Sequence, residues 1–285
     1  MTLQALLFHA EQFLARAGSA RPAFEARYLL AGLLGLNHAE LFLYKNQQLS
    51  QAEQDRYQDM LEQRGQGRPL QYIIGTTHFW TRDFIVTPDV LIPRPETEYI
   101  VEQALAELHA FTPKPQTLKL LDLGTGSGVI ADILADELGC TVVGVDISWP
   151  ALQVARRNIC EHGLSRQVSL ICSDLFSAFA RGTTFDAIIA NLPYVETDVR
   201  EKLDREVVDH EPALALFAGP DGLDCYRRCI AEAGEYLCTG GALLLEIGAT
   251  QGKAVAQLLT DNNFVDIEIR HDYAGLPRCV CARKA

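Results

Sequence analysis

The stretch L-L-D-L-G-T-G-S-G-V-I, from Leu120 to Ile130, decides the fold class. An apolar run that ends in alternate glycines and continues into a helical pattern predicts a strand, a tight turn and a helix. Gly124, Gly126 and Gly128 make the turn possible and let a ligand lie directly on the backbone. A dinucleotide-binding fingerprint would need its third glycine at Val129. The motif therefore fits a nucleoside without a pyrophosphate better than NAD, which argues against a nicotinamide-dependent oxidoreductase.

From this motif to the C-terminus, apolar runs alternate with helical patterns. We expect strands at 118–123, 141–146, 168–172, 185–190, 242–247, 265–270 and 279–283, and helices at 129–138, 150–161, 222–237 and 251–260. Such alternation predicts an α/β fold whose mainly parallel sheet is covered on both faces. Only the short loop H-D-Y-A-G-L-P-R joins the last two strands, so we expect them to form an antiparallel edge pair.

The N-terminal part of the chain has helical spacing instead. Apolar residues recur at three-four spacing from Leu3 to Ala17. Pro22 suits the first turn of a second helix that stops near Gly35. Ser50 and Glu53 have the spacing of a capping box for a third helix. A helix bundle of this size is typical of a structural or partner-binding domain.

A connector separates the two patterns. The runs Thr76–Trp80 and Phe84–Thr87 predict a β-hairpin, and L-I-P-R-P-E-T-E (Leu91 to Glu98) leads into a helix that ends near Leu108. The proline-rich residues 112–117 predict a linker. We therefore divide the chain into a small helical partner-binding domain, a hairpin connector with its helix, and a strand–helix domain, at 1–74, 75–111 and 112–285.

Composition excludes several classes of protein. The 285 residues carry a formal net charge of -12, which argues against direct binding of bare nucleic acid. Apolar runs are too short for a membrane span, and Glu11 interrupts the first of them, so no signal peptide is expected. The eight cysteines lack zinc-finger spacing. We expect a cytoplasmic protein with reduced structural cysteines and no metal site.

Acidic residues follow the next two strands. Asp146 closes T-V-V-G-V-D, where a carboxylate can accept both hydroxyls of a ribose. The alternative is that Asp146 caps the following helix. Asp174 lies in S-D-L-F at the end of the third strand, where a lone aspartate is often a turn residue.

The glycine turn looks like the first motif of Rossmann-like class I methyltransferases. That resemblance implies S-adenosylmethionine as the cofactor, with Asp122 helping to hold the methionine ammonium group. It also implies that Asp174 contacts the adenine amino group and that Leu175 packs beside the ring. The cofactor-binding residues expected on this basis are Asp122, Gly124, Thr125, Gly126, Ser127, Gly128, Asp146, Asp174, Leu175 and Asn191.

The fourth strand runs directly into N-L-P-Y, Asn191 to Tyr194. This turn is similar to the N-P-P-Y motif of enzymes that methylate planar amide or exocyclic amino nitrogens. An amide nitrogen is a poor nucleophile, and a site can help by accepting both of its N–H bonds in line with the donor methyl. The Asn191 side-chain oxygen and the Leu192 carbonyl are the candidate acceptors, and Tyr194 would pack on the flat substrate group. We expect Asn191, Leu192, Pro193 and Tyr194 to be the catalytic and substrate-binding residues.

Over nearly its whole length the chain resembles the glutamine N5-methyltransferases of peptide chain release factors. The segments that carry the resemblance are R-P-L-Q-Y-I-I-G (68–75), L-I-P-R-P-E-T-E (91–98), D-L-G-T-G-S-G (122–128), N-L-P-Y (191–194), E-P-A-L-A-L (211–216) and D-Y-A-G-L-P-R (272–278). The resemblance implies a substrate glutamine in the Gly-Gly-Gln loop of class 1 release factors, with the N-terminal domain helping to hold that protein. The lack of a long apolar run predicts no membrane partner, and we expect a monomer.

Two positions depart from the family pattern. Leu192 stands where proline is usual, which keeps the carbonyl but adds an N–H and loosens φ. Leu175 replaces an aromatic residue and offers no π face to adenine. Two alternatives stay open: an adenine N6-methyltransferase acting on nucleic acid, and a cofactor-binding protein that has lost catalysis. Arg94 and Glu96 either shape the substrate entrance or only fix the connector.

Overall fold

The computed structural model describes residues 1–112 and 114–285, so Pro113 of the expected linker lies outside the described residues. The chain forms two compact units. One consists of residues 1–76 together with 204–210, and the other of residues 77–203 together with 211–285. The sequence therefore leaves the second unit once, between Leu203 and Glu211, and then returns to it.

The larger unit contains a mainly parallel sheet of seven strands. Its strands are β3 (Lys119–Leu123), β4 (Thr141–Asp146), β5 (Val168–Cys172), β6 (Phe185–Ala190), β7 (Leu237–Glu246), β8 (Phe264–His271) and β9 (Pro277–Lys284). They lie in the order β5-β4-β3-β6-β7-β9-β8, and β9 runs antiparallel to both of its neighbours. The expected parallel sheet and antiparallel edge are confirmed. Strand β7 begins at Leu237, earlier than expected, because Leu237 already pairs with Phe185.

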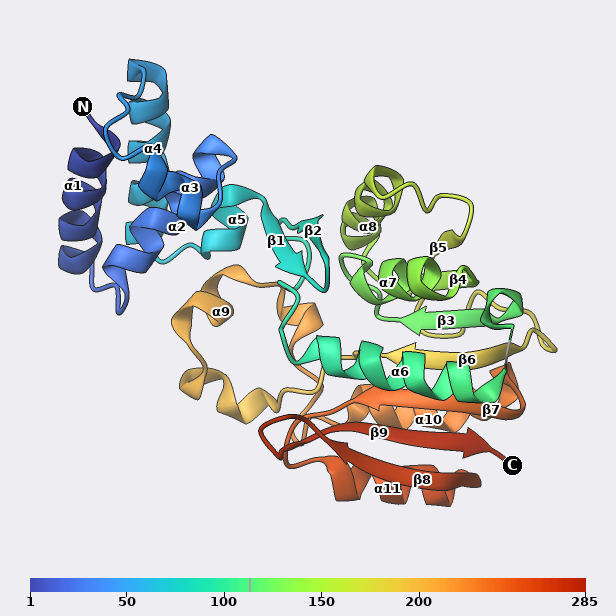
Figure 1. Ribbon diagram of the computed structural model, residues 1–285. Helices are drawn as coiled ribbons and strands as arrows, with labels where there is room; N and C mark the ends of the chain where they lie inside the picture. Colours follow the sequence, from blue (N-terminus) through green and yellow to red (C-terminus); the bar gives the residue numbers. More distant parts are fainter. Residues whose placement is uncertain (113) are drawn as a thin grey trace. The chain divides into compact units, whose positions relative to one another are not determined.

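Helices cover both faces of this sheet (Figure 1). The core on one face combines sheet residues with α6 (Thr97–Phe111), α7 (Val129–Leu138) and α8 (Trp149–Glu161). The core on the other face includes α10 (Asp224–Tyr236) and α11 (Gly252–Asp261). Neighbouring strand residues alternate between the two cores, as Ile188 and Ile189 do. Because both sides of each central strand are buried, the strands read as unbroken apolar runs in the sequence.

The strand register brings the ends of β3, β4 and β6 to one edge of the sheet. Leu123, the last residue of β3, pairs with Val145 on one side and with Ala190 on the other. The glycine turn follows Leu123, and Asn191 follows Ala190. Because all three strands are parallel, the loops that follow them emerge side by side, where open α/β folds bind ligands.

A short hairpin precedes α6. It consists of β1 (Thr76–Phe79) and β2 (Arg82–Ile85). Strand β1 is one residue shorter than expected, and β2 has the expected length but lies two residues earlier in the chain. Trp80 has a φ of 60° and is part of the turn rather than of β1. Its backbone N–H donates to the Glu98 carboxylate at 2.8 Å, which ties the turn to the first turn of α6.

The smaller unit is helical. Its helices are α1 (Leu3–Arg16), α2 (Pro22–Leu34), α3 (His38–Leu43), α4 (Gln51–Gly65) and α5 (Leu70–Ile74), with α9 (Arg205–His210) from the returning segment. As expected, Pro22 opens α2, Gly35 ends it with a φ of 63°, and Ser50 and Glu53 form the capping box of α4. The short helices α3 and α5 were not anticipated, although Asn37 and Glu40 form a second capping box in front of α3.

Arg64 holds the returning segment within the helical unit. Its guanidinium donates to both carboxylate oxygens of Glu25, at 2.9 and 2.8 Å, and to Glu206 at 2.7 Å. A fourth hydrogen bond goes to the Arg68 carbonyl at 3.0 Å. Because the planar guanidinium presents several fixed donors, one side chain can bind α2, α9 and the loop after its own helix together.

Two global expectations can be compared with the structure. Cys140, Cys229, Cys279 and Cys281 are buried, whereas Cys160 and Cys172 are exposed, so the expected burial of the thiols applies to only part of the set. Within residues 1–112 and 114–285, none of the helices combines the length and apolar character needed to cross a membrane.

Candidate active site

Backbone hydrogen bonds to β4 hold the glycine turn that follows β3. The N–H groups of Gly124 and Thr125 both donate to the Val145 carbonyl of β4, at 2.8 and 2.9 Å. Gly124, Gly126 and Gly128 have φ values of 74°, 56° and 87°, which side-chain-bearing residues rarely adopt. A Cβ atom on Gly124 would lie only 3.1 Å from the Asn191 carbonyl oxygen. Glycine is therefore required both by conformation and by the closeness of the next loop.

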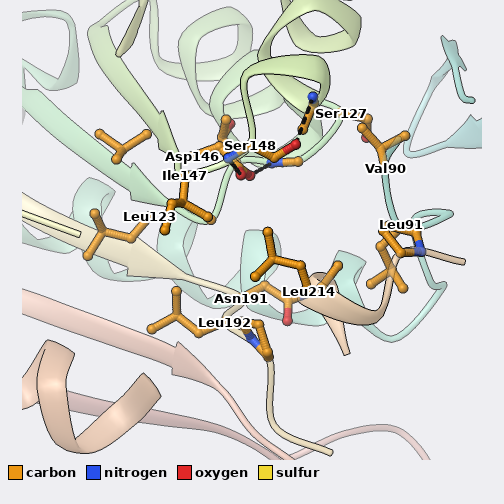
Figure 2. Close-up of a pocket in the computed structure, with 18 of the residues that line it drawn as sticks. Val90, Leu91, Leu123, Ser127, Asp146, Ile147, Ser148, Asn191, Leu192 and Leu214 are labelled. Carbon is orange, nitrogen blue, oxygen red and sulfur yellow. Dashed lines mark hydrogen bonds between the residues drawn. The ribbon is translucent and has the colours of Figure 1, made fainter. Parts of the chain in front are cut away.

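Asp146 links the end of β4 to this turn. One carboxylate oxygen accepts from the Gly126 N–H at 2.9 Å, and the other accepts from the Ser148 N–H at 2.8 Å (Figure 2). Burial raises the pKa of Asp146, and these backbone hydrogen bonds counteract part of that rise. Ser148, not Asp146, is the N-cap of α8 and accepts from Ala151. Each Asp146 oxygen keeps a further lone pair, so hydroxyl donors from a ligand can still bind it.

Asp122 is fully buried behind the turn and is not among the residues that line the pocket. One of its oxygens accepts from the Thr125 hydroxyl at 2.6 Å and from the Ala131 N–H at 3.1 Å. The other oxygen has no hydrogen-bond partner among the described residues. Burial raises the pKa of Asp122 to about 7, and the nearby Asp146 charge adds to the rise. Asp122 thus holds the turn from inside and keeps one oxygen unsatisfied.

Asp174 and Leu175 follow β5 and also line the pocket. The Asp174 carboxylate accepts from Arg228 at 2.7 Å, and both side chains are about half exposed. Leu175 has a φ of 47°, a left-handed conformation that is uncommon for a residue other than glycine. Backbone in such regions is often found at ligand sites, where the surrounding structure maintains it.

The N-L-P-Y turn forms the opposite wall. Figure 2 shows Asn191 and Leu192 facing Asp146 and Ser148 across the pocket. The Leu192 side chain is buried in the sheet core, close to Gly124. Tyr194 does not line the pocket: its hydroxyl donates to Glu246 at 3.4 Å, and its carbonyl accepts from Gln251 at 2.9 Å.

A third wall comes from the segment before α6. Arg94 donates to the Glu211 carboxylate at 2.6 Å, and the Ile92 N–H donates to the other Glu211 oxygen at 3.2 Å. Arg94 and Leu214 themselves line the pocket. Arg94 therefore fixes the connector to Glu211 and borders the cavity, whereas Glu96 does not line it.

One cavity thus collects most of the expected site residues. Those that line it are Gly124, Thr125, Gly126, Ser127, Asp146, Asp174, Leu175, Asn191, Leu192 and Pro193. Asp122, Gly128 and Tyr194 lie behind its wall. Sequence reasoning missed Thr97, which also lines the cavity, and Glu246, which is buried behind it. Glu246 ends β7 next to β6, so its position at a strand end was the available signal.

Comparison with known proteins gives two family models that match this chain. The PrmC N-terminal domain matches residues 5–75, and a methyltransferase domain matches residues 120–210. A release factor glutamine methyltransferase from Koribacter versatilis is 40% identical, with the alignment covering 100% of this chain and 99% of the relative.

The chain belongs to the release factor glutamine methyltransferase family. A second relative of that name, from Moorella thermoacetica, is 40% identical over 99% of this chain and 98% of its own length. These full-length matches include the helical unit.

Solved structures support the fold alone. A methyltransferase from Pyrococcus furiosus matches with a TM-score of 0.52 and 17% identity, covering 71% of this chain and 89% of the neighbour. The catalytic domain of hMettl16, in complex with the MAT2A 3'UTR hairpin 6, matches with a TM-score of 0.57 and 13% identity, covering 83% of this chain and 82% of the neighbour. The Rossmann-like class I methyltransferase fold expected from the sequence is therefore confirmed.

Proposed function

We propose that this chain transfers a methyl group from S-adenosylmethionine to the side-chain amide N5 of the glutamine in the Gly-Gly-Gln motif of class 1 peptide chain release factors. The observation that carries the proposal is that the glycine turn and the Asn191 turn open into one cavity. The substrate is inferred from membership of the release factor glutamine methyltransferase family.

The residues around the cavity suit S-adenosylmethionine. Gly126 leaves the backbone bare, and Asp146 retains lone pairs for the two ribose hydroxyls. Asp174 and Leu175 are positioned for the adenine, although Asp174 must share its carboxylate with Arg228. The unsatisfied oxygen of the buried Asp122 is the proposed acceptor for the methionine ammonium group. When bound, the cofactor supplies a methyl group on a positively charged sulfur.

Asn191 and Leu192 account for recognition of the amide. The Asn191 side-chain oxygen and the Leu192 carbonyl accept the two N–H bonds of the glutamine carboxamide and hold its nitrogen toward the donor methyl. The methyl group would come from S-adenosylmethionine, which would leave as a neutral thioether. The nitrogen then loses one proton to solvent, which restores a neutral amide. A strong base is unnecessary, because the nitrogen becomes acidic once it carries the methyl group.

The helical residues 1–74 are proposed to hold the release factor, and residues 75–111 to connect them to the methyltransferase domain at 112–285. Release factors act in translation, so a cytoplasmic location follows from this substrate. With a net charge of -12, the chain is poorly suited to gripping nucleic acid directly.

Methyl transfer with an isotope-labelled cofactor tests the proposal. The acceptors are a purified class 1 release factor, the same factor with its Gly-Gly-Gln glutamine changed to alanine, and an adenine-containing oligonucleotide. Label is expected only in the unaltered factor. Label in the oligonucleotide instead would establish the adenine N6 alternative. Cofactor binding by calorimetry without label in any acceptor would establish the non-catalytic one.

A further inference from the structure

Three buried or partly buried side chains, those of Thr97, Tyr194 and Glu246, lie close to Asn191. Thr97 begins α6 and is 2% exposed, and its hydroxyl oxygen accepts from the Asn191 side-chain nitrogen at 3.2 Å. Glu246 ends β7 and is 1% exposed. Tyr194 donates to one Glu246 oxygen at 3.4 Å, and the other oxygen has no partner among the described residues.

The side-chain amide of Asn191 can present either its oxygen or its nitrogen to the cavity. Which of the two it presents decides whether Asn191 can accept a hydrogen bond from the substrate amide. Its oxygen accepts hydrogen bonds and its nitrogen donates them, so a half-turn of the amide exchanges acceptor for donor. Only the oxygen can receive an N–H from a substrate carboxamide. An Asn191 that presents its NH₂ group to the cavity would oppose the substrate N–H instead.

Thr97 can choose between these orientations only if its own proton is engaged elsewhere. A threonine hydroxyl has one proton and can otherwise donate to the Asn191 oxygen or accept from its nitrogen. The Thr97 hydroxyl lowers the pKa of the nearby Glu246 carboxyl, one oxygen of which has no hydrogen-bond partner among the described residues. With the proton directed to that carboxylate, the Thr97 oxygen is left as an acceptor, and Asn191 must turn its nitrogen toward it.

We propose that Thr97 and Glu246 are positioning residues that fix the Asn191 carboxamide with its oxygen toward the cavity, so that it accepts from the substrate amide. This inference rests on the proposed function for its consequence in catalysis. The orientation itself is a property of the protein without substrate. Neither residue touches the reacting atoms: Thr97 acts through Asn191, and Glu246 acts through Thr97.

The charge on Glu246 makes the arrangement depend on pH. Burial raises the pKa of Glu246 to about 7, and the Thr97 hydroxyl, Arg278 on β9 and Tyr194 counteract the rise while Glu96 adds to it. The Tyr226 hydroxyl donates to the main-chain oxygen of Glu246 and not to its carboxyl. Above this pKa the carboxylate accepts from Thr97. Below it, the protonated carboxyl can donate to the Thr97 oxygen and compete with Asn191.

Substitutions at Thr97 test the positioning role. Thr97→Val keeps the shape and removes the hydroxyl, and it is expected to lower kcat about tenfold or more while leaving the cofactor Kd unchanged. Thr97→Ser restores the hydroxyl and is expected to restore most of kcat. Thr77→Val is the matched control, because Thr77 is also buried but does not line the cavity. A fully active Thr97→Val, or a Thr97→Ser as defective as Thr97→Val, would overturn the proposal.

The pH profile tests the part assigned to Glu246. At saturating cofactor, kcat of the wild type is expected to fall as the pH drops through about 7. Glu246→Gln can still accept from Thr97 but does not titrate in this range, so its kcat is expected to lose that fall. A Glu246→Gln variant with the same pH dependence of kcat as the wild type would contradict the role proposed for Glu246.

Nuclear magnetic resonance separates failure of this inference from failure of the proposed function. The side-chain amide signals of Asn191, identified by their loss in Asn191→Ala, report its hydrogen bond without any methyl transfer. They are expected to move in Thr97→Val and to stay in place in Thr77→Val. Unmoved signals in Thr97→Val contradict the inference even if release factor is methylated. Moved signals without methylation would support it and count against the proposed function only.

Discussion

The Asp146 carboxylate accepts a hydrogen bond from the backbone N–H of Gly126 at 2.9 Å. This contact joins the end of β4 to the glycine turn after β3, so the proposed ribose acceptor and the loop beneath it form one rigid feature. The second oxygen of Asp146 binds the Ser148 N–H at the start of α8. Asp146 therefore has a structural part as well as its proposed part in binding, and experiments must separate the two.

Asp146→Ala is expected to raise the cofactor dissociation constant about tenfold or more, because a charged acceptor of two hydroxyls is lost. Calorimetry measures this constant, and thermal unfolding measures the structural loss. Asp261→Ala, at the exposed end of α11, is the matched control and should change neither. An unchanged dissociation constant combined with a lower melting temperature would leave Asp146 with its structural part alone.

The closeness of Gly124 to the Asn191 carbonyl gives a second prediction. Gly124→Ala must accept both a positive φ and a Cβ 3.1 Å from that oxygen, whereas Gly163→Ala has a φ of 76° with nothing within 4 Å. Both variants should lose about 1–2 kcal/mol from the left-handed backbone. Gly124→Ala should lose more, and its cofactor affinity should fall as well. Equal losses in stability and intact cofactor binding in both variants would mean that the two turns are not as tightly apposed as described.

Asn191→Ala should retain cofactor binding and lose most turnover, since it removes an acceptor for the reacting amide and leaves the glycine turn in place. Calorimetry and single-turnover methyl transfer measure the two quantities separately. Normal turnover with collapsed cofactor affinity would assign Asn191 to the cofactor instead.

Stability should depend on pH through Asp122 and Glu246. Burial raises the pKa of each to about 7, well above the ordinary value of a carboxyl group. Between about pH 4 and 7 the folded chain therefore binds more protons at these sites than the unfolded chain does, so these two groups lower stability as the pH rises.

Unfolding by denaturant across this range, without cofactor, checks the sign. Relative to the wild type, Asp122→Asn and Glu246→Gln should gain stability toward pH 7, by at most about 1.4 kcal/mol per pH unit for each group. Variants that lose stability relative to the wild type as the pH rises would show that these carboxyls are ionised in the folded protein.

Much of the fold could be predicted because it follows from local pattern. The buried strands are unbroken apolar runs. The glycines at 124, 126 and 128 mark a tight turn, because that turn requires the positive φ values found at all three positions. Strand ends share an edge in a parallel sheet, so Asp146 and Asn191 could be placed at one site before any coordinates.

What could not be predicted depends on contacts between distant segments. Nothing in the sequence around Glu206 indicates that residues 204–210 join the helical unit through Arg64. Thr97 belongs to the segment L-I-P-R-P-E-T-E, but that segment does not reveal its partner. Thr97 is hydrogen-bonded to Asn191, which lies 94 residues further along the chain. Tyr194 was expected beside the substrate, and the structure has it behind the cavity wall, bonded to Glu246.

Mass spectrometry of a release factor after incubation with this protein and S-adenosylmethionine tests the central claim most directly. The peptide that contains Gly-Gly-Gln is predicted to gain the mass of one CH₂ group, and fragmentation should place it on the glutamine side chain. An unmodified glutamine, or a methyl group on any other residue, would contradict the account.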